Sequence, residues 1–352
     1  MKLLVWLFAM VLVTLTLQKE DYFVNWEEYN GGGDRNHYSE LTQLNKQNIN
    51  QLKVAWTYRS GGVDTIGNRT QIQCNPIIID GILYGVSANT QAFAVDAASG
   101  KELWKTSLKD NGGTTSRGVT YWTDGKDKRI FFGAGKWLYA IDPKTGTLVK
   151  TFGEQGRIDL KIGIERPGAD DYLTSNTPNT IFKNLIIVGT RVNEIETALL
   201  GDIRAYDTKT GKLAWTFHTI PQKDEPGYET WLNGDPRQKT GGANAWTGMA
   251  IDRKRGIVYI PTGSAAYDFY GGNRPGDNLY ANCLLALDAA TGKKIWHYQL
   301  VHHDIWDRDP PSPPNLTTIT VNGTQHEVVT LTTKQGMVFV LDRLTGNCGN
   351  AI

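Results

Sequence analysis

Residues 94–104 read AVDAASGKELW, and the same pattern returns as AYDTKTGKLAW at 205–215 and as ALDAATGKKIW at 286–296. Two shorter copies, AIDPKTG at 140–146 and VLDRLTG at 340–346, keep the same spacing from Asp to Gly. In the three long copies, a Trp follows the Asp at a fixed distance. This repeat predicts a β-hairpin in which an apolar strand ends at Asp, the Thr/Ser-Gly pair forms the tight turn, and the second strand carries Trp.

Further short apolar strands precede these hairpins, at 76–79 with 83–86, at 185–188 and at 257–261. A strand pair followed by a hairpin gives four strands per unit, which indicates an all-β fold built as a β-propeller. In such a fold, the repeated Trp can wedge between neighbouring sheets. The sequence VAW at 54–56 resembles the Trp half of an earlier unit. A Trp-rich β-sandwich is the alternative, but five copies of one turn favour the propeller.

The composition excludes several classes of protein. The 352 residues include 37 basic and 36 acidic side chains, so the net charge of +1 gives no electrostatic reason to expect a nucleic-acid partner. A hydrophobic content of 40% and a charged content of 21% exclude a disordered chain. The three cysteines are widely spaced and form no CxxC motif, which argues against a haem attachment site or a cysteine metal site.

The N-terminus has the composition of a targeting segment. Met1 and Lys2 precede an apolar run over residues 3–13. A positive start followed by an apolar run of this length predicts a secretory signal peptide over residues 1–20. An uncleaved anchor, which would associate the protein with a membrane, is the alternative. In either case, we expect residues 21–352 to be exported, as a periplasmic protein would be.

The repeated Asp-x-x-Thr-Gly-Lys-x-x-Trp pattern resembles that of the quinoprotein alcohol and sugar dehydrogenases, which use pyrroloquinoline quinone (PQQ) on an eight-bladed propeller. Residues 26–58 are similar to the N-terminal entry of that family, and 302–307 (HHDIWD) to its catalytic segment. The segments GGNR at 271–274 and TKQG at 333–336 are most similar to the membrane-type glucose dehydrogenase branch. The resemblance implies a PQQ-binding propeller domain over residues 21–352.

The resemblance also implies a set of cofactor-binding residues. PQQ is a flat tricarboxylate, and a guanidinium suits such an anion because it can bind a carboxylate with two hydrogen bonds. Arg117 matches the family arginine that binds a PQQ carboxylate, and Trp246 matches the tryptophan that lies flat on the quinone. Ser175 stands where the family has a cofactor-bonded hydroxyl, and Gln73 where it usually has Glu. Lys334 matches the cation over the quinone oxygens.

A divalent cation and a catalytic base complete the implied site. Ca²⁺, or Mg²⁺ in its place, prefers oxygen ligands and would polarise the quinone carbonyl. Glu194 matches the family's acidic ligand, Asn193 is its neighbour, and Ser264 replaces the family's Asn ligand. Asp307, which follows Trp in the catalytic segment, matches the base that takes the hydroxyl proton of the substrate, and also lies near the metal.

Two departures from the family's residues narrow the prediction of which branch the chain resembles. The vicinal Cys-Cys pair of the methanol and ethanol enzymes is missing, because residues 110–115 read DNGGTT. Gly113 stands where the enterobacterial glucose enzyme has His. The repeat also stops inside its fifth unit, where Asn350 replaces Trp. We therefore expect about five of the family's eight blades here, with the C-terminal blades missing.

These observations predict a dehydrogenase that oxidises a sugar or polyol hydroxyl with PQQ as hydride acceptor. The electrons would pass to a quinone or to a cytochrome c on another chain. A non-catalytic PQQ-repeat propeller, acting as an envelope scaffold or assembly protein, is one alternative. A quinoprotein for a small primary alcohol is another, although the missing Cys-Cys pair and Lys334 argue against it.

Overall fold

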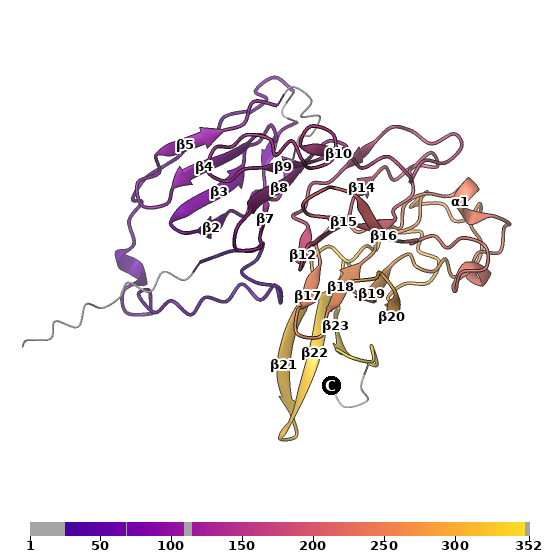
Figure 1. The fold of residues 1–352 in the computed structure, drawn as a ribbon. Helices are drawn as coiled ribbons and strands as arrows, with labels where there is room; N and C mark the ends of the chain where they lie inside the picture. The colour runs from indigo at the N-terminus through magenta and orange to yellow at the C-terminus, as the bar shows by residue number, and fades with distance from the viewer. Residues whose placement is uncertain (1–24, 68, 109–114, 349–352) are drawn as a thin grey trace, which may run out of the picture.

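A computed structural model describes residues 25–67, 69–108 and 115–348. Within these ranges, almost all regular structure is β-strand, arranged in five antiparallel sheets that follow one another along the chain (Figure 1). Four of these sheets have four strands, and the fifth, at the C-terminal end of the chain, has three. The fold is therefore the predicted all-β propeller of four-stranded blades.

The five sheets contain strands in simple up-and-down order. The first sheet contains β2 (Ile77–Ile79), β3 (Ile82–Val86), β4 (Ala92–Asp96) and β5 (Glu102–Lys105). The second contains β7 (Thr120–Thr123), β8 (Lys128–Ala134), β9 (Trp137–Ile141) and β10 (Arg157–Asp159). The third contains β12 (Thr180–Phe182), β13 (Leu185–Val188), β15 (Ile203–Asp207) and β16 (Leu213–Phe217). The fourth contains β17 (Ala250–Asp252), β18 (Ile257–Pro261), β19 (Cys283–Asp288) and β20 (Lys294–Gln299). The fifth contains β21 (Asn315–Val321), β22 (Thr324–Thr332) and β23 (Val338–Asp342).

Short elements fill some of the connections. Two-stranded pairs form between β1 (Gln71–Ile72) and β6 (Thr115–Ser116), and between β11 (Leu173–Thr174) and β14 (Arg191–Val192). The helical elements of the described residues are single turns, namely η1 (Ile49–Gln51), η2 (Tyr228–Thr230) and α1 (Pro236–Lys239). No helix within the described ranges has the length and apolar composition needed to cross a lipid bilayer.

The repeated turn has the predicted chemistry. In the hairpin β15–β16, the Asp207 carboxylate accepts hydrogen bonds from the N–H and the hydroxyl of Thr210, both at 2.7 Å. Gly211 has a φ of +72° and donates its N–H to the Asp207 carbonyl oxygen at 2.8 Å. The left-handed conformation explains why each copy ends in Gly.

The repeated Trp locks each sheet to the next. The Trp215 ring packs against Gly292 in the turn of the following sheet, where a Cβ atom would lie 2.5 Å from the ring. Its indole N–H donates to the Ala289 carbonyl oxygen at 3.3 Å. Trp56, Trp104 and Trp296 make the equivalent contacts with the turns at Gly100, Gly146 and Gly346. The Trp of one unit therefore packs on the turn of the next, as expected for residues that wedge between blades.

The apolar cores lie between neighbouring sheets. One core joins the first and second sheets through Val86 and Phe132, and the next joins the second and third through Phe131 and Ile186. Equivalent clusters join the third sheet to the fourth and the fourth to the fifth. The second, third and fourth sheets have such a core on each face, and their middle strands, such as β8 and β19, are almost continuously buried.

The second sheet departs from the repeat. After the turn at 142–146, the chain makes only an isolated bridge between Leu148 and Ile141, and the outer strand β10 begins at Arg157. This explains why the copy at 140–146 has no Trp at the usual distance. The predicted segment 1–20, the stretch 110–114 and Asn350 lie outside the described residues, so their predicted roles stay predictions.

The segment before the first sheet ties several sheets together. Arg35 is fully buried and donates to the carbonyl oxygens of Tyr29 and Met249 at 2.6 and 2.7 Å and to the Thr180 hydroxyl at 3.2 Å. The Gly33 carbonyl oxygen also accepts the N–H of Ile251 at 2.7 Å. These bonds fix the third and fourth sheets, whose loops carry much of the cavity described next.

Candidate functional site

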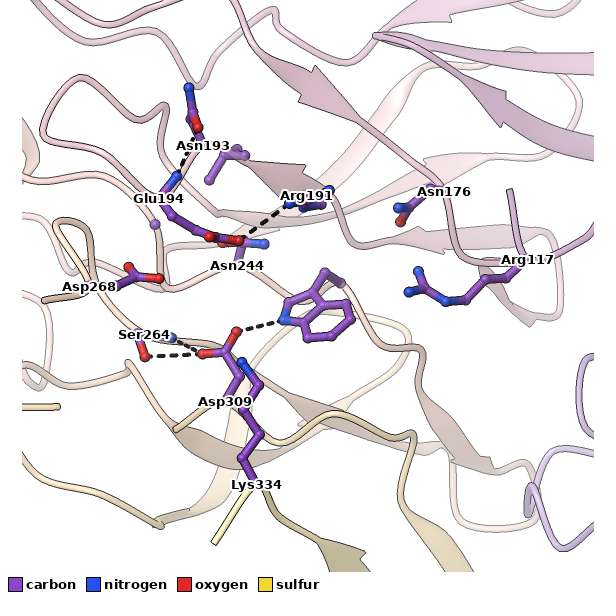
Figure 2. A pocket seen from close by; sticks show the side chains of 13 residues that line it. Arg117, Asn176, Arg191, Asn193, Glu194, Asn244, Ser264, Asp268, Asp309 and Lys334 are labelled. Carbon is purple, nitrogen blue, oxygen red and sulfur yellow. Dashed lines mark hydrogen bonds and ion pairs between the residues drawn. The ribbon is translucent and has the colours of Figure 1, made fainter. Parts of the chain in front are cut away.

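A cavity of about 620 Å³, open to solvent, lies where loops of the second to fifth sheets converge (Figure 2). These loops connect strands that are hydrogen-bonded into antiparallel sheets, so the sheets act as a rigid support for them. Polar side chains predominate in its wall, which is formed by Arg117, Asn176, Arg191, Val192, Asn193, Glu194, Gly242, Asn244, Trp246, Ser264, Asp268, Asp309 and Lys334.

Arg117 supplies positive charge to one side of the cavity. It follows β6, and its backbone N–H donates to the Asn176 carbonyl oxygen at 2.7 Å. Its guanidinium donates to the Thr177 hydroxyl at 3.0 Å and lies 5.4 Å from the ring centre of Trp246. The side chain is therefore held over an aromatic face while part of its fork remains available to an anion.

Trp246 is held at both ends of the residue. Its backbone carbonyl oxygen accepts the Thr177 hydroxyl at 2.6 Å, and its indole N–H donates to Asp309 Oδ2 at 2.8 Å. The side chain belongs to none of the repeated turns, and it is only partly buried because it borders the cavity. An aromatic ring between a guanidinium and a carboxylate forms a flat surface on which a planar ligand can stack.

Carboxylates gather on the side of the cavity opposite Arg117 (Figure 2). Burial, together with the neighbouring charges of Asp309, Glu194 and Asp307, raises the pKa of Asp268 to about 8. Burial also raises the pKa of Asp309, which is 8% exposed. Like charges held together in a poorly solvated site are costly unless a proton or a cation neutralises them.

Lys334 enters the cavity from the turn between β22 and β23. Its ammonium lies 2.6 Å from the carboxylate of Asp307, on the loop between β20 and β21. Asp307 itself has a φ of +52° and lies outside the cavity wall, with about a third of its side chain exposed. The predicted base and the predicted cation of the site are therefore an ion pair at the cavity edge.

The structure brings most of the predicted site residues to this cavity, with three exceptions. Arg117, Trp246, Lys334, Glu194, Asn193 and Ser264 line it. Gln73 is exposed and donates its side-chain N–H to Gln71 at 2.8 Å. Ser175 is buried beside Asn176, and its hydroxyl is 3.4 Å from the Gly189 carbonyl oxygen. Like Asp307, these two residues do not form the cavity wall.

The four predicted metal ligands are not assembled as a shell. Asn193 donates to Asp170 at 2.7 Å and accepts the Glu194 N–H at 3.1 Å, so its amide is already engaged. Ser264 Oγ lies 2.6 Å from Asp304 and 3.0 Å from Asp309. In the described part of the chain, no three His, Cys, Asp or Glu side chains are grouped to hold a metal ion. The oxygen donors of Glu194 and Asp268 nevertheless have the chemistry that Ca²⁺ or Mg²⁺ prefers.

Several cavity residues are absent from the predicted set. Asn176, Arg191 and Asn244 lie inside motifs that carry predicted residues, one or a few positions away from Ser175, Glu194 and Trp246. Asp309 lies two positions after Asp307, so the motif located the loop but not the side chain that enters the cavity. Asp268 had no motif, and only the three-dimensional arrangement identifies it.

The lining fits a flat, anionic ligand such as PQQ. Arg117, Arg191 and Lys334 offer three cations to a tricarboxylate, and Asn176 and Asn244 can offer amide donors. Trp246 supplies the aromatic surface. Carboxylates on the opposite side suit a divalent cation placed between them and the oxygens of such a ligand.

Comparison with known proteins gives one family. A family model described as "PQQ: Glucose/ethanol/alcohol dehydrogenase, beta-propeller domain" matches residues 26–348. The quinoprotein glucose dehydrogenase of Escherichia coli is 34% identical over 344 residues, which cover 92% of this chain and 43% of that protein. The quinate/shikimate dehydrogenase (quinone) of Acinetobacter baylyi is 33% identical over 355 residues, with the same coverage. The chain thus spans less than half the length of these curated relatives.

Solved structures agree with these relatives. The quinohemoprotein alcohol dehydrogenase from Comamonas testosteroni superposes with a TM-score of 0.79 at 26% sequence identity. The matched region covers 93% of this chain and 49% of that one. The likeness therefore extends over nearly all of the present chain.

Proposed function

Because the chain belongs to the family of PQQ-dependent glucose, ethanol and alcohol dehydrogenase β-propellers, we propose that it binds PQQ in this cavity and oxidises a sugar or polyol hydroxyl. The observation that carries the proposal is the single cavity that combines the Trp246 ring, three cations and opposed carboxylates. Relatives named as glucose, glycerol and quinate/shikimate dehydrogenases support a polyhydroxylated substrate. The absence of a Cys-Cys pair from residues 110–115 also supports it.

The cofactor-binding roles follow from charge and shape. Arg117 and Arg191 would bind carboxylates of PQQ, because a guanidinium matches the planar anion with paired donors. Trp246 would support the ring system, and Asn176 and Asn244 would donate to its polar edge. When bound, PQQ supplies an ortho-quinone that accepts hydride. Ser175 and Gln73 would act at the margin of the site, since neither forms the cavity wall.

Asp307 and Lys334 would together accept the hydroxyl proton of the substrate, with Asp307 as the base and Lys334 as its partner. The carboxylate of Asp307 would take the hydroxyl proton of the substrate, and the ammonium 2.6 Å away would hold that carboxylate in place. Both side chains are about one-third exposed, so a substrate hydroxyl can reach the pair from solvent. Lys334, which also lines the cavity, would place its positive charge beside the quinone oxygens.

A divalent cation, Ca²⁺ or Mg²⁺, would be held by the carboxylate side of the cavity. Of the predicted ligands, Glu194 and Ser264 line the cavity, and Asp268 adds a carboxylate that sequence reasoning missed. Binding of a cation there would neutralise the mutual repulsion of the carboxylates. Asn193 would orient Glu194 through the bond to its backbone N–H.

We further propose that the protein acts in the periplasm and passes electrons to a quinone or cytochrome c. The hydrophobic run at residues 3–13 supports export, and the same segment would associate the protein with a membrane if it stays uncleaved. Relatives named as quinone-linked dehydrogenases support a quinone acceptor.

The test is a dye-reduction assay on protein that has been loaded with PQQ and Ca²⁺. We expect reduction of an artificial electron acceptor with at least one sugar or polyol, and a loss of at least about 100-fold in kcat with Asp307→Asn. PQQ binding by this variant, measured separately, should be retained. Stoichiometric PQQ binding without dye reduction by any alcohol would contradict the dehydrogenase and favour a non-catalytic propeller.

A further inference from the structure

Asp309 connects the cavity tryptophan to the loop after β18. One carboxylate oxygen, Oδ2, accepts the indole N–H of Trp246 at 2.8 Å. The other, Oδ1, accepts the backbone N–H of Ser264 at 2.6 Å and lies 3.0 Å from the Ser264 hydroxyl. A single carboxylate therefore bridges two segments of the fourth sheet, one before β17 and one after β18.

The carboxylate of Asp309 is itself tightly placed. The residue is 8% exposed, and its two oxygens would lie 2.8 Å from a Cβ atom at Gly263, so only glycine permits this approach. Ser264 is fixed in turn, because Asn282 donates to its hydroxyl at 3.1 Å and to Asp304 at 3.0 Å. A buried acceptor with fixed donors has little freedom to move away from the indole.

The other polar contacts of Trp246 restrain its indole less. Thr177 fixes its backbone carbonyl, which leaves the side-chain torsions free. Arg117 lies over the ring at 5.4 Å, a contact that tolerates sliding and tilting of the ring. The directional bond to Asp309 is therefore the contact that fixes the orientation of the ring plane.

We propose that Asp309 is a positioning residue: it sets the plane of the Trp246 indole before the cofactor arrives. The orientation itself is a property of the protein alone. Its consequence for PQQ rests on the proposed function, because a preorganised stacking surface spares the ligand the cost of ordering the ring. Asp307, two positions away and paired with Lys334, has no such contact and serves as the matched comparison.

The first test needs no cofactor. In protein labelled with ¹⁵N-tryptophan, Trp246→Phe identifies the Trp246 indole N–H resonance by its disappearance. We expect Asp309→Ala to move that resonance upfield and to speed its exchange with water, because a charge-assisted bond is lost. The resonance of Trp215, which donates to a backbone carbonyl, and the spectrum of Asp307→Asn should stay in place. An unmoved Trp246 resonance in folded Asp309→Ala would overturn the proposal.

Two further measurements complete the test. One shows that the effect of Asp309→Ala does not come from misfolding, and the other separates the positioning role of Asp309 from the proposed PQQ binding. Gly263→Ala keeps the carboxylate but obstructs it, so the Trp246 resonance should move in the same direction. In calorimetric titrations with PQQ, Asp309→Ala should raise Kd about tenfold to hundredfold, and should add little in a Trp246→Phe background. Additive effects of the two substitutions would overturn positioning. Absence of PQQ binding by the wild-type chain would instead contradict the proposed function and leave the resonance test valid.

Discussion

Trp215 stacks on the turn glycine of the next sheet and gives its indole N–H to a backbone carbonyl, whereas Trp246 borders the cavity and gives its N–H to a carboxylate. Trp215 is 8% exposed and its contact recurs at Trp56, Trp104 and Trp296. The contacts of Trp246 belong to none of the repeated turns. The repeat builds the scaffold, and a departure from it forms the site.

The two tryptophan rings differ in how they are packed. The ring of Trp215 fills the space between two sheets, so its removal leaves a cavity in a close-packed core. The ring of Trp246 is only partly buried and lines the cavity. Stability should therefore depend on the first tryptophan and ligand binding on the second.

The largest expected effect tests this separation. Trp215→Ala should lower the free energy of unfolding by about 3–5 kcal/mol, because it removes a buried aromatic ring between two sheets. Trp246→Ala should cost less, about 1.5–3 kcal/mol, the value of one lost hydrogen bond to a charged group. Urea unfolding followed by far-UV circular dichroism measures both. Equal losses of stability would break the comparison.

A smaller effect concerns pH and the carboxylate side of the cavity. Folded Asp268 keeps its proton up to a pKa of about 8, whereas an unfolded Asp loses it near pH 4. The folded state therefore binds more protons in this window, so the stabilisation is present at low pH and is lost as pH rises towards 8.

Without divalent cations, wild-type protein should lose about 2–3 kcal/mol of stability from this group between pH 6 and pH 8.5. Asp268→Asn, which cannot ionise, should show a correspondingly shallower dependence, measured by urea unfolding in a chelator at both pH values. Asp159→Asn serves as a control, since that carboxylate is paired with Lys136 outside the cavity. Parallel pH dependences for wild type and Asp268→Asn would contradict the buried, repelled carboxylate.

Much of the scaffold was predictable because its rules are local. The Asp-to-Gly spacing fixes a turn whose hydrogen bonds involve neighbouring residues, as at Asp207 and Thr210. The prediction of an all-β propeller with Trp wedges is therefore confirmed. The long insertion before β10 was not predicted, because the turn at 142–146 looks like the others and gives no signal of where pairing resumes.

The site was less predictable because it depends on which side chain of a loop turns inward. The motif around Trp306 located the loop, yet Asp309, rather than Asp307, lines the cavity. Asp268 reaches the same place from another loop without any motif. Such side-chain directions depend on long-range contacts, such as the bond between Asp309 and Ser264, that spacing along the chain does not encode.

The most direct measurement is a calorimetric titration of the chain with PQQ, with and without Ca²⁺, on wild type, Trp246→Ala and Trp215→Phe. We expect saturable binding that is strengthened by Ca²⁺, weakened at least about tenfold in Trp246→Ala, and unchanged in Trp215→Phe. Binding that Trp246→Ala leaves intact, or no binding to protein shown to be folded, would contradict the assignment of this cavity as the PQQ site.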